Sequence, residues 1–370
     1  MLVINGKYNQ AVVYTSDLEE SVHQQIVHLL EMPYVVNSRI RMMPDVHAGI
    51  GCAIGTTMTI QDKIVPNLVG VDIGCGMRTI QIKTRTINYH HLDEVIRLHI
   101  PSGFNVRKDL HENNGLIDLK KLRCLKNAHI DIQRASLSLG TLGGGNHFIE
   151  IGKDSEGLLY LIIHSGSRQL GLQVANYYQK KAYETMSSED KKVIPKSLAY
   201  LQGHDMEDYV HDMMIVQKYA LLNRKTMAEI IIKELKWQVG ESFNTIHNYY
   251  NPETKILRKG AVSANAGEKL LIPMNMRDGS LICIGKGNDE WNYSAPHGAG
   301  RIMSRKEAKQ KLSMKAYEET MRHVYSTSIN KKTLDEAPMA YKSMDEIKDK
   351  IADTAEILDI LKPIYNFKAV

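Results

Sequence analysis

The stretch VGVDIGCGMRTIQI, residues 69–82, is the segment from which we interpret the fold. Its apolar runs are short and broken by glycine, a pattern typical of strands and tight turns in a buried sheet. The segment GIGCAIGTTMTI, residues 49–60, repeats the pattern, and LLYLIIHSGSR, residues 158–168, is also strand-like. We therefore predict strands in these segments and, with strand and turn character returning there, in residues 261–305.

Helical spacing of apolar residues appears elsewhere along the chain. A capping box at residues 16–19 precedes a helical pattern that runs from Leu18 to Leu30, and a long helix is predicted between 204 and 237. A final helix is predicted through Ile347, Ile351 and Leu358, with its end near Pro363. The sequence contains both strand and helix patterns and has no internal repeat or Pro/Ser-rich linker. We therefore predict a single α/β (α+β) unit.

Composition excludes several classes of protein. With 43% hydrophobic and 24% charged residues over 370 positions, the chain has the balance of a folded soluble protein. It has no apolar run of about 18 residues and no signal-peptide pattern, so we expect a cytoplasmic protein without membrane contact. The net charge of +5 agrees with an anionic partner, although many proteins that bind no nucleic acid share it.

Asp72 and Cys75 lie three positions apart in an otherwise apolar, glycine-flanked stretch. Burying an ionised carboxylate is costly unless it is paired or bound to a metal, and a thiolate is a strong ligand for soft and borderline divalent ions. Metal binding would explain both residues. Alternatively, Asp72 caps a turn and Cys75 fills the core, and this segment alone leaves both interpretations open. The other cysteines, which form no CxxC pair, are Cys52, Cys124 and Cys283.

Three histidines have surroundings that suit metal ligands: His147 after a run of glycines, His164 at the end of an apolar strand, and His247 in IHNYY. Imidazole is the commonest metal ligand, and glycine lets backbone and ligand approach closely. Each of them, taken singly, can also be a structural histidine. His47 is intermediate, because Asp45 two residues earlier could orient it or share a metal.

The segment SAPHGAGR, residues 294–301, places His297 between proline and glycine. This predicts a turn with an exposed imidazole, and Arg301 offers a fork of donors suited to phosphate. A neutral imidazole nitrogen can attack phosphorus. A turn histidine beside a structural arginine is the alternative. The sequence lacks a Walker phosphate loop, an HExxH zinc helix and the KxDG signature of lysine-nucleophile ligases.

Taken together, several motifs resemble the RtcB family of RNA ligases, and they occur in one order along the chain. They are MPDVHAGIG (43–51), VGVDIGCGM (69–77), LGGGNHFIE (142–150), HSGSRQLG (164–171), HNYY (247–250), PHGAGRIMSR (296–305) and DEAPMAYK (335–342). The resemblance implies a single catalytic domain over residues 1–370, with mixed sheets around a central metal and GTP pocket.

The resemblance also assigns roles by motif. It implies two Mn²⁺ ions held by Asp72, Cys75, His147, His164 and His247, and guanylylation of His297. It implies a GTP pocket formed by Asn146, Phe148, Glu150, Ser280, His297, Tyr341 and Lys368. The basic residues that it implies for RNA phosphates are Arg168, Lys259, Arg301 and Arg305.

Two departures from the family pattern concern the nucleotide loop and the length. Met274 and Asn275 follow Pro273 where many members carry glycine and serine, and the chain reads SAPHGAG where others have a small residue or cysteine before the histidine. The stretch between His247 and Lys259 is compressed. These features indicate a short, divergent bacterial-type member, and they leave its nucleotide preference open.

The implied reaction is GTP- and Mn²⁺-dependent joining of an RNA 3′-phosphate or 2′,3′-cyclic phosphate to a 5′-hydroxyl, in RNA repair or tRNA splicing. The implied partner is RNA with these ends, an activating protein is a further candidate partner, and we expect a monomer. Two alternatives remain: a metal-dependent RNA phosphodiesterase, which needs no GTP pocket, and an inactive RNA-binding homologue, in which losses among Asp72, Cys75 or His297 would be expected.

Overall fold

The largest sheet of the protein carries the segment from which the fold was interpreted. In the computed structural model, which describes residues 1–369, seven strands pair in the order β10-β6-β8-β7-β17-β15-β14. Adjacent strands of this sheet are antiparallel. Their bounds are β10 Val239–Ile246, β6 Gly76–Ile82, β8 Leu159–Ser165, β7 Phe148–Lys153, β17 Ala355–Lys368, β15 Gly279–Gly285 and β14 Lys269–Asn275.

A second sheet of six strands has the order β1-β2-β3-β4-β12-β11 and is mixed, because β2 and β3 are parallel. Its strands are β1 Leu2–Asn5, β2 Gln10–Val13, β3 Ile40–His47, β4 Ile54–Thr59, β12 Ile256–Lys259 and β11 Asn248–Asn251. Two short pairs are β13 Ala261–Ser263 with β16 Ser294–Pro296, and β5 Lys63–Ile64 with β9 Leu201–Gln202. The fold is therefore α+β with mixed pairing, as predicted.

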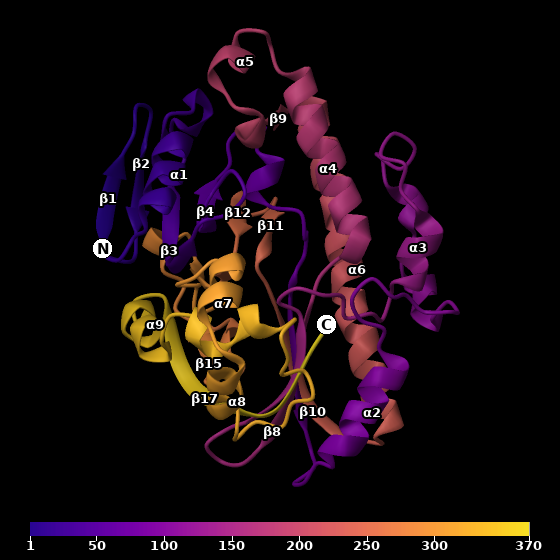
Figure 1. Ribbon diagram of the computed structural model, residues 1–370. Helices are drawn as coiled ribbons and strands as arrows, with labels where there is room; N and C mark the ends of the chain where they lie inside the picture. Colours follow the sequence, from indigo (N-terminus) through magenta and orange to yellow (C-terminus); the bar gives the residue numbers. More distant parts are fainter. Residues whose placement is uncertain (370) are drawn as a thin grey trace.

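Two long helices, α4 and α6, lie side by side along one flank of the molecule (Figure 1), where the rings of Tyr178 and Tyr209 are 5.0 Å apart. The helices are α1 Glu20–Leu30, α2 Tyr89–His99, α3 Ile132–Leu137, α4 Arg168–Thr185, α5 Asp190–Val193, α6 Gly203–Glu234, α7 Arg305–Lys311, α8 Met314–Thr320 and α9 Met344–Ile351. None of the helices formed by residues 1–369 combines the length and apolar character that crossing a bilayer requires.

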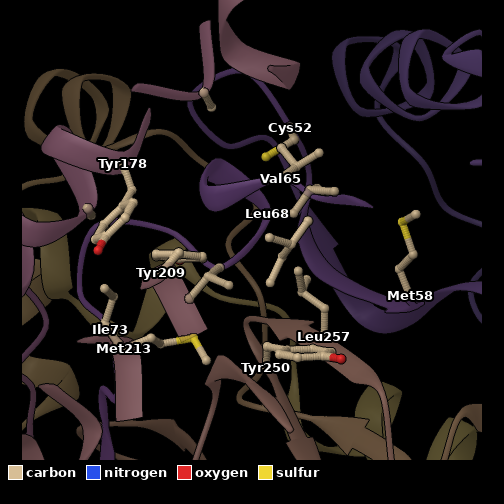
Figure 2. Packing of buried hydrophobic residues seen from close by; sticks show 14 of the residues in the cluster. Cys52, Met58, Val65, Leu68, Ile73, Tyr178, Tyr209, Met213, Tyr250 and Leu257 are labelled. Atoms are coloured by element: carbon tan, nitrogen blue, oxygen red, sulfur yellow. The ribbon is translucent and has the colours of Figure 1, made fainter. Parts of the chain in front are cut away.

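The main core joins these helices to the six-stranded sheet. Figure 2 shows Tyr178 and Tyr209 from α4 and α6 in the same cluster as Tyr250 and Leu257 from β11 and β12. The same cluster contains Ile73, from the turn that precedes β6. Burial of this residue fixes the turn that carries Asp72 and Cys75, since apolar side chains stabilise a fold by leaving water.

The predicted elements are confirmed over most of the chain and wrong at both ends. Strands form within 49–60, 69–82, 158–168 and 261–305, and α6 matches the predicted long helix. The first helix begins at Glu20, and its N-cap Glu19 makes no side-chain capping bond, so the capping box is wrong.

The predicted final helix is also wrong beyond Ile351. Leu358 and Pro363 lie in β17, between β7 and β15, where the register shifts between Pro363 and Tyr365. Proline cannot donate a ladder hydrogen bond, and such an irregularity is where a paired strand tolerates it. Three apolar residues at helical spacing were therefore insufficient to separate a short helix from the strand that follows it.

Candidate active site

Three potential ligand atoms meet at one end of the seven-stranded sheet. The Cys75 Sγ lies 3.5 Å from His147 Nε2 and 3.4 Å from His164 Nε2. Donor atoms of all three residues are within 4.8 Å of one another, and the residues are buried. A thiol and two imidazoles at this spacing form a group that can hold a divalent metal ion.

Strand pairing explains why residues so far apart in sequence meet here. In the register of β6 and β8, Gly76 pairs with Ser165, so Cys75 lies next to the end of β8 that carries His164. In the register of β7 and β8, Phe148 pairs with His164, which brings the preceding His147 to the same end. Three adjacent strands therefore present one ligand each.

Backbone carbonyls fix the orientation of both imidazoles. His147 Nδ1 lies 2.9 Å from the Leu142 carbonyl oxygen, and His164 Nδ1 lies 3.2 Å from that of Asn146. Only a protonated Nδ1 can donate to a carbonyl, so in the neutral form of each ring the lone pair lies on Nε2, the nitrogen next to the thiol. Burial is also the main reason why the pKa of His164 lies well below its ordinary value, which keeps that ring neutral.

The thiol of Cys75 is held in its protonated form by its surroundings. Burial, followed by the charge of Asp72, raises the pKa of Cys75 well above its ordinary value. A bound cation would reverse this balance, because metal binding displaces the thiol proton. The donor set therefore fits a divalent metal ion on three grounds: its chemistry, its spacing and its oriented imidazoles.

Asp72 and His247 lie beside this group. Asp72 Oδ2 is 3.1 Å from His147 Nε2, and its other oxygen accepts from the Ser167 backbone N–H at 3.0 Å. Burial opposes ionisation of Asp72, but the contact with His147 and the charge of Arg168 outweigh it, so its pKa lies below the ordinary value. An ionised carboxylate next to the histidines adds a potential oxygen ligand to the group.

His247 is placed by the turn between β10 and β11. Its backbone N–H donates to the Cys75 carbonyl at 3.0 Å, and its ring centre is 5.3 Å from that of His164. Within residues 1–369, the buried Nδ1 of His247 makes no hydrogen bond. Burial lowers the pKa of His247 well below its ordinary value, so the ring is neutral and one of its two nitrogens has a lone pair available to a ligand.

His297 follows β16 and lies next to His247, with ring centres 5.1 Å apart. Its Nδ1 is 2.7 Å from Asp45 Oδ2, which also accepts from the backbone N–H groups of His297 at 3.2 Å and Gly298 at 3.1 Å. The 2.7 Å approach is an ion-pair distance that lacks hydrogen-bond alignment in this conformation. Only 18% of the His297 side chain is exposed, so the predicted exposed imidazole is wrong.

The role foreseen for Asp45 also changes. The sequence left open whether Asp45 orients His47 or shares a metal with it, and in the structure only its backbone carbonyl contacts the Nδ1 of His47, at 2.9 Å. Its carboxylate is fully buried and faces His297 instead. The ring of His47 stacks on that of His297 with centres 6.1 Å apart, and burial together with His297 lowers the pKa of His47 to about 4.

Glu336 is the centre of a second polar cluster. Its carboxylate contacts Lys368 Nζ at 2.6 Å and the Tyr341 hydroxyl at 2.8 Å. Arg305 donates to it at 2.5 Å, and Arg301 at 3.4 Å. Burial alone would raise the pKa of Glu336, but Lys368 and Arg305 lower it to about 2. Four of the predicted nucleotide and phosphate residues therefore meet around one carboxylate.

The other predicted nucleotide residues line β7 and β15. The centre of the Phe148 ring lies 5.3 Å from that of the His164 ring, and Lys368 Nζ lies 5.5 Å from the centre of the Phe148 ring. Glu150 accepts from Asn366 Nδ2 at 2.7 Å, and burial raises the pKa of Glu150 to about 8. Of the two remaining residues predicted for the nucleotide pocket, Asn146 is exposed and Ser280 is buried.

Two predicted phosphate residues make internal contacts. Arg168 donates from Nη2 to the Gly103 carbonyl at 3.1 Å and from Nε to Thr141 Oγ1 at 3.3 Å, while its charge favours the ionised form of Asp72. Lys259 is buried, and its Nζ lies 2.8 Å from the Cys52 Sγ and 2.8 Å from the Asn67 carbonyl. Its ammonium therefore joins two segments of the core.

Comparison with known proteins places this arrangement in a family. The family described as tRNA-splicing ligase RtcB matches residues 25–124 and 89–369. The chain belongs to the RtcB family. It is 31% identical to the RNA-splicing ligase RtcB of Escherichia coli, over 94% of each chain. It is 25% identical to the tRNA-splicing ligase RtcB of Archaeoglobus fulgidus, over 94% of this chain and 91% of that relative.

In this RtcB family member, a residue of α6 forms hydrogen bonds with the segments that carry His147 and His164. The Asn223 Oδ1 accepts from the backbone of Gly140 and Thr141, at 2.8 and 3.1 Å, in the loop that leads to His147. Its Nδ2 contacts the Gly166 carbonyl at 3.2 Å, beyond the end of β8. One buried amide thus ties together two ligand-bearing segments.

The next residue, Arg224, is also fully buried. Its Nη1 donates to the carbonyls of Gly74 at 2.9 Å and Ser165 at 2.7 Å, next to Cys75 and His164 respectively. A buried guanidinium is stable only where carbonyls and anions compensate its charge, and here the Asp72 carboxylate lies close enough to contribute. Helix α6 therefore fixes the backbone on both sides of the ligands.

Sequence reasoning assigned no role to Asn223, Arg224 or Glu336 in this RtcB family chain. The signal for the first two was a polar pair on the apolar face of a predicted helix, since such residues are buried only when they are hydrogen-bonded. Glu336 lay within a quoted motif, but the sequence alone gave no reason to prefer it to the adjacent Asp335.

Proposed function

We propose that this chain is a GTP- and Mn²⁺-dependent RNA ligase that joins an RNA 3′-phosphate or 2′,3′-cyclic phosphate to a 5′-hydroxyl through a GMP-histidine intermediate. The observation that carries the proposal is the position of His297: it contacts Asp45 on one side and lies against His247 and the Cys75 group on the other. A nucleophile beside a metal centre is the arrangement that nucleotidyl transfer requires.

Asp45 would set the tautomer of His297. A proton on Nδ1, held toward the carboxylate 2.7 Å away, leaves the lone pair on Nε2. That nitrogen would form a bond to the α-phosphorus of GTP while pyrophosphate leaves. The developing imidazolium would be stabilised by the Asp45 carboxylate, as an acid orients and stabilises the histidine of a hydrolase triad.

The guanylyl group would then move to the RNA. The terminal 3′-phosphate displaces His297 from GMP, and the RNA 5′-hydroxyl next attacks the activated 3′-phosphorus, forms the phosphodiester and releases GMP. A 2′,3′-cyclic phosphate must first be opened by water. The arginines would position phosphates without reading bases, so that the end chemistry of the RNA determines specificity.

The residues that would hold two Mn²⁺ ions are Asp72, Cys75, His147, His164 and His247. When bound, the ions would supply Lewis-acid stabilisation of phosphate charge. The GTP pocket would be formed by Asn146, Phe148, Glu150, Ser280, Tyr341 and Lys368 around His297. The contacts of Phe148, Tyr341 and Lys368 support this assignment, because a ring, a hydroxyl and an ammonium converge near Glu336.

Incubation with α-labelled GTP and Mn²⁺ tests the proposal. Label should become attached to the protein, survive alkali and be lost in mild acid, because a phosphoramidate is acid-labile. His297→Ala should abolish both the label and the joining of RNA ends, whereas His323→Ala, at an exposed histidine, should retain both. Normal labelling of the His297 variant, or equal labelling from ATP, would refute the mechanism or its nucleotide.

The two alternatives make different predictions. A phosphodiesterase using the same ligands would turn over RNA without GTP, and the residues around Glu150 and Glu336 would then have no nucleotide to bind. An inactive RNA-binding homologue would take no label. The retention of Asp72, Cys75 and His297 argues against an inactive homologue. The presence of Asn146, Glu150, Tyr341 and Lys368 argues against a phosphodiesterase, which needs no GTP pocket.

Further parts of the proposal concern the setting of the enzyme. We infer one catalytic domain over residues 1–370, a monomer in the cytoplasm that acts in RNA repair or tRNA splicing and has no membrane contact. An activating protein is a candidate partner. Strand β17 supports the single domain, because it pairs with β7 on one side and β15 on the other.

A further inference from the structure

The aromatic ring of Phe104 lies almost entirely in solvent, with 95% of the residue exposed. Phenylalanine is ordinarily among the most buried residue types. The backbone before it is nonetheless anchored: Gly103 N–H donates to the Gly143 carbonyl at 2.9 Å, and Ser102 forms a β-bridge with the same glycine. An exposed aromatic ring on a fixed backbone is available for contact with a binding partner.

The anchor of Phe104 is part of the candidate active site. Gly143 belongs to the loop that ends at His147, and its φ of +83° is one that glycine adopts readily. A side chain at this position would collide with the guanidinium of Arg168, which donates to the Gly103 carbonyl at 3.1 Å. The backbone next to Phe104 is therefore tied both to the loop that leads to His147 and to Arg168.

Basic residues contact the backbone of Phe104 or follow it closely in the chain. Arg134 Nη2 donates to the Phe104 carbonyl at 2.9 Å, and its Nε donates to Gln169 at 2.6 Å. Arg107 and Lys108 follow Phe104 in the chain. Proteins that bind single-stranded nucleic acid combine such cations, which follow the phosphates, with aromatic rings on which bases stack.

We propose that Phe104 is a stacking platform for an unpaired base near the RNA end that is being joined. The inference rests on the proposed function, because the base belongs to the RNA substrate. Every base has a π-face, so the platform would accept any of them and would add affinity without sequence preference. It would hold the strand while Arg168 and Arg134 contact its phosphates.

Fluorescence of 2-aminopurine tests this contact. The probe is single-stranded RNA with a 3′-phosphate and 2-aminopurine as its terminal base, whose emission falls when the base stacks on a ring. Wild-type protein should quench the probe. Phe104→Ala should abolish the quenching and weaken binding about tenfold, the order expected for one stacked base. Phe104→Tyr should retain both properties, and Phe104→Leu should lose them although it remains apolar.

Leu110→Ala is the matched control, because Leu110 is 62% exposed in the same segment but has no ring. It should bind and quench like wild type. Quenching that persists in Phe104→Ala, or is normal in Phe104→Leu, overturns the stacking proposal. Sedimentation that reveals wild-type dimers dissociated by Phe104→Ala would also overturn it, by assigning the ring to a contact between copies.

The two proposals can fail separately. Wild-type protein that takes no label from GTP and joins no RNA refutes the proposed ligase. Wild-type protein that is labelled and joins RNA, while Phe104→Ala binds the probe as tightly as wild type, refutes only the stacking platform.

Discussion

Replacement of Asn223 by alanine should damage the metal centre without touching a proposed ligand. The side chain is fully buried, and its Oδ1 accepts from the backbone of Gly140 and Thr141. Its Nδ2 lies within 3.2 Å of the oxygens of Thr141, Ser165 and Gly166. An amide nitrogen has only two hydrogens, so these five contacts amount to about four hydrogen bonds.

At about 1 kcal/mol for each bond, Asn223→Ala should lower the free energy of unfolding by about 4 kcal/mol. Urea denaturation followed by circular dichroism measures this loss. Because the same bonds fix the segments that carry His147 and His164, affinity for Mn²⁺ should also fall by about 10- to 100-fold, as measured by titration calorimetry on the folded variant.

Asn265→Ala provides the matched control, since Asn265 is exposed and bonds only within its own turn. Its effect on unfolding should be within about 0.5 kcal/mol, and its Mn²⁺ affinity should be that of wild type. The reasoning is refuted if Asn223→Ala unfolds within about 1 kcal/mol of wild type, or if it is strongly destabilised but binds Mn²⁺ normally once folded.

Three further predictions concern the ligands, the nucleophile and a buried acid. Activity should depend on Mn²⁺ rather than Mg²⁺, because a thiolate and imidazoles suit the softer ion. Cys75→Ala should abolish metal binding, whereas Cys283→Ala, at another buried cysteine, should retain it. Full activity with Mg²⁺ alone would contradict the assignment of Cys75 as a metal ligand. Asp45→Asn should slow GMP labelling of His297 by about 100-fold or more at unchanged metal content, and labelling at the wild-type rate would exclude a positioning role. Burial raises the pKa of Glu150 to about 8, so the stability from its protonated form is present below about 4.5 and is lost as pH rises through 8. Urea unfolding from pH 5 to 9 should show this decline in wild type and a smaller one in Glu150→Gln; equal slopes would indicate an ordinary Glu150.

Local patterns in the sequence predicted the parts of the structure that depend on neighbouring residues. Glycine-broken apolar runs predicted the strand that follows Cys75 and the strand that carries His164, and helical spacing predicted α6. A proline was interpreted as a helix end at Pro363, although the residue lies inside β17. Whether a short apolar segment becomes a strand there depends on its partners β7 and β15, which periodicity does not reveal.

The candidate site was predictable where chemistry is unusual for its surroundings and unpredictable where it depends on distance. A carboxylate beside a thiol in an apolar stretch drew attention to Asp72 and Cys75. The contact of Asp45 with His297 joins residues 252 positions apart, which no local pattern encodes. The same holds for Asn223, whose importance lies entirely in the loops that it contacts.

The late position of β17 in the sequence determines the order in which the parts of the candidate site are synthesised. Strand β8 pairs with β6 on one side and β7 on the other, so all three residues of the Cys75 group have been synthesised long before residue 355 is added. Asn366 and Lys368, which reach Glu150 and Glu336, arrive only with β17. A chain released before β17 would therefore contain the thiol and imidazoles but lack the two residues that contact Glu150 and Glu336, so the polar cluster of the proposed nucleotide pocket is completed last.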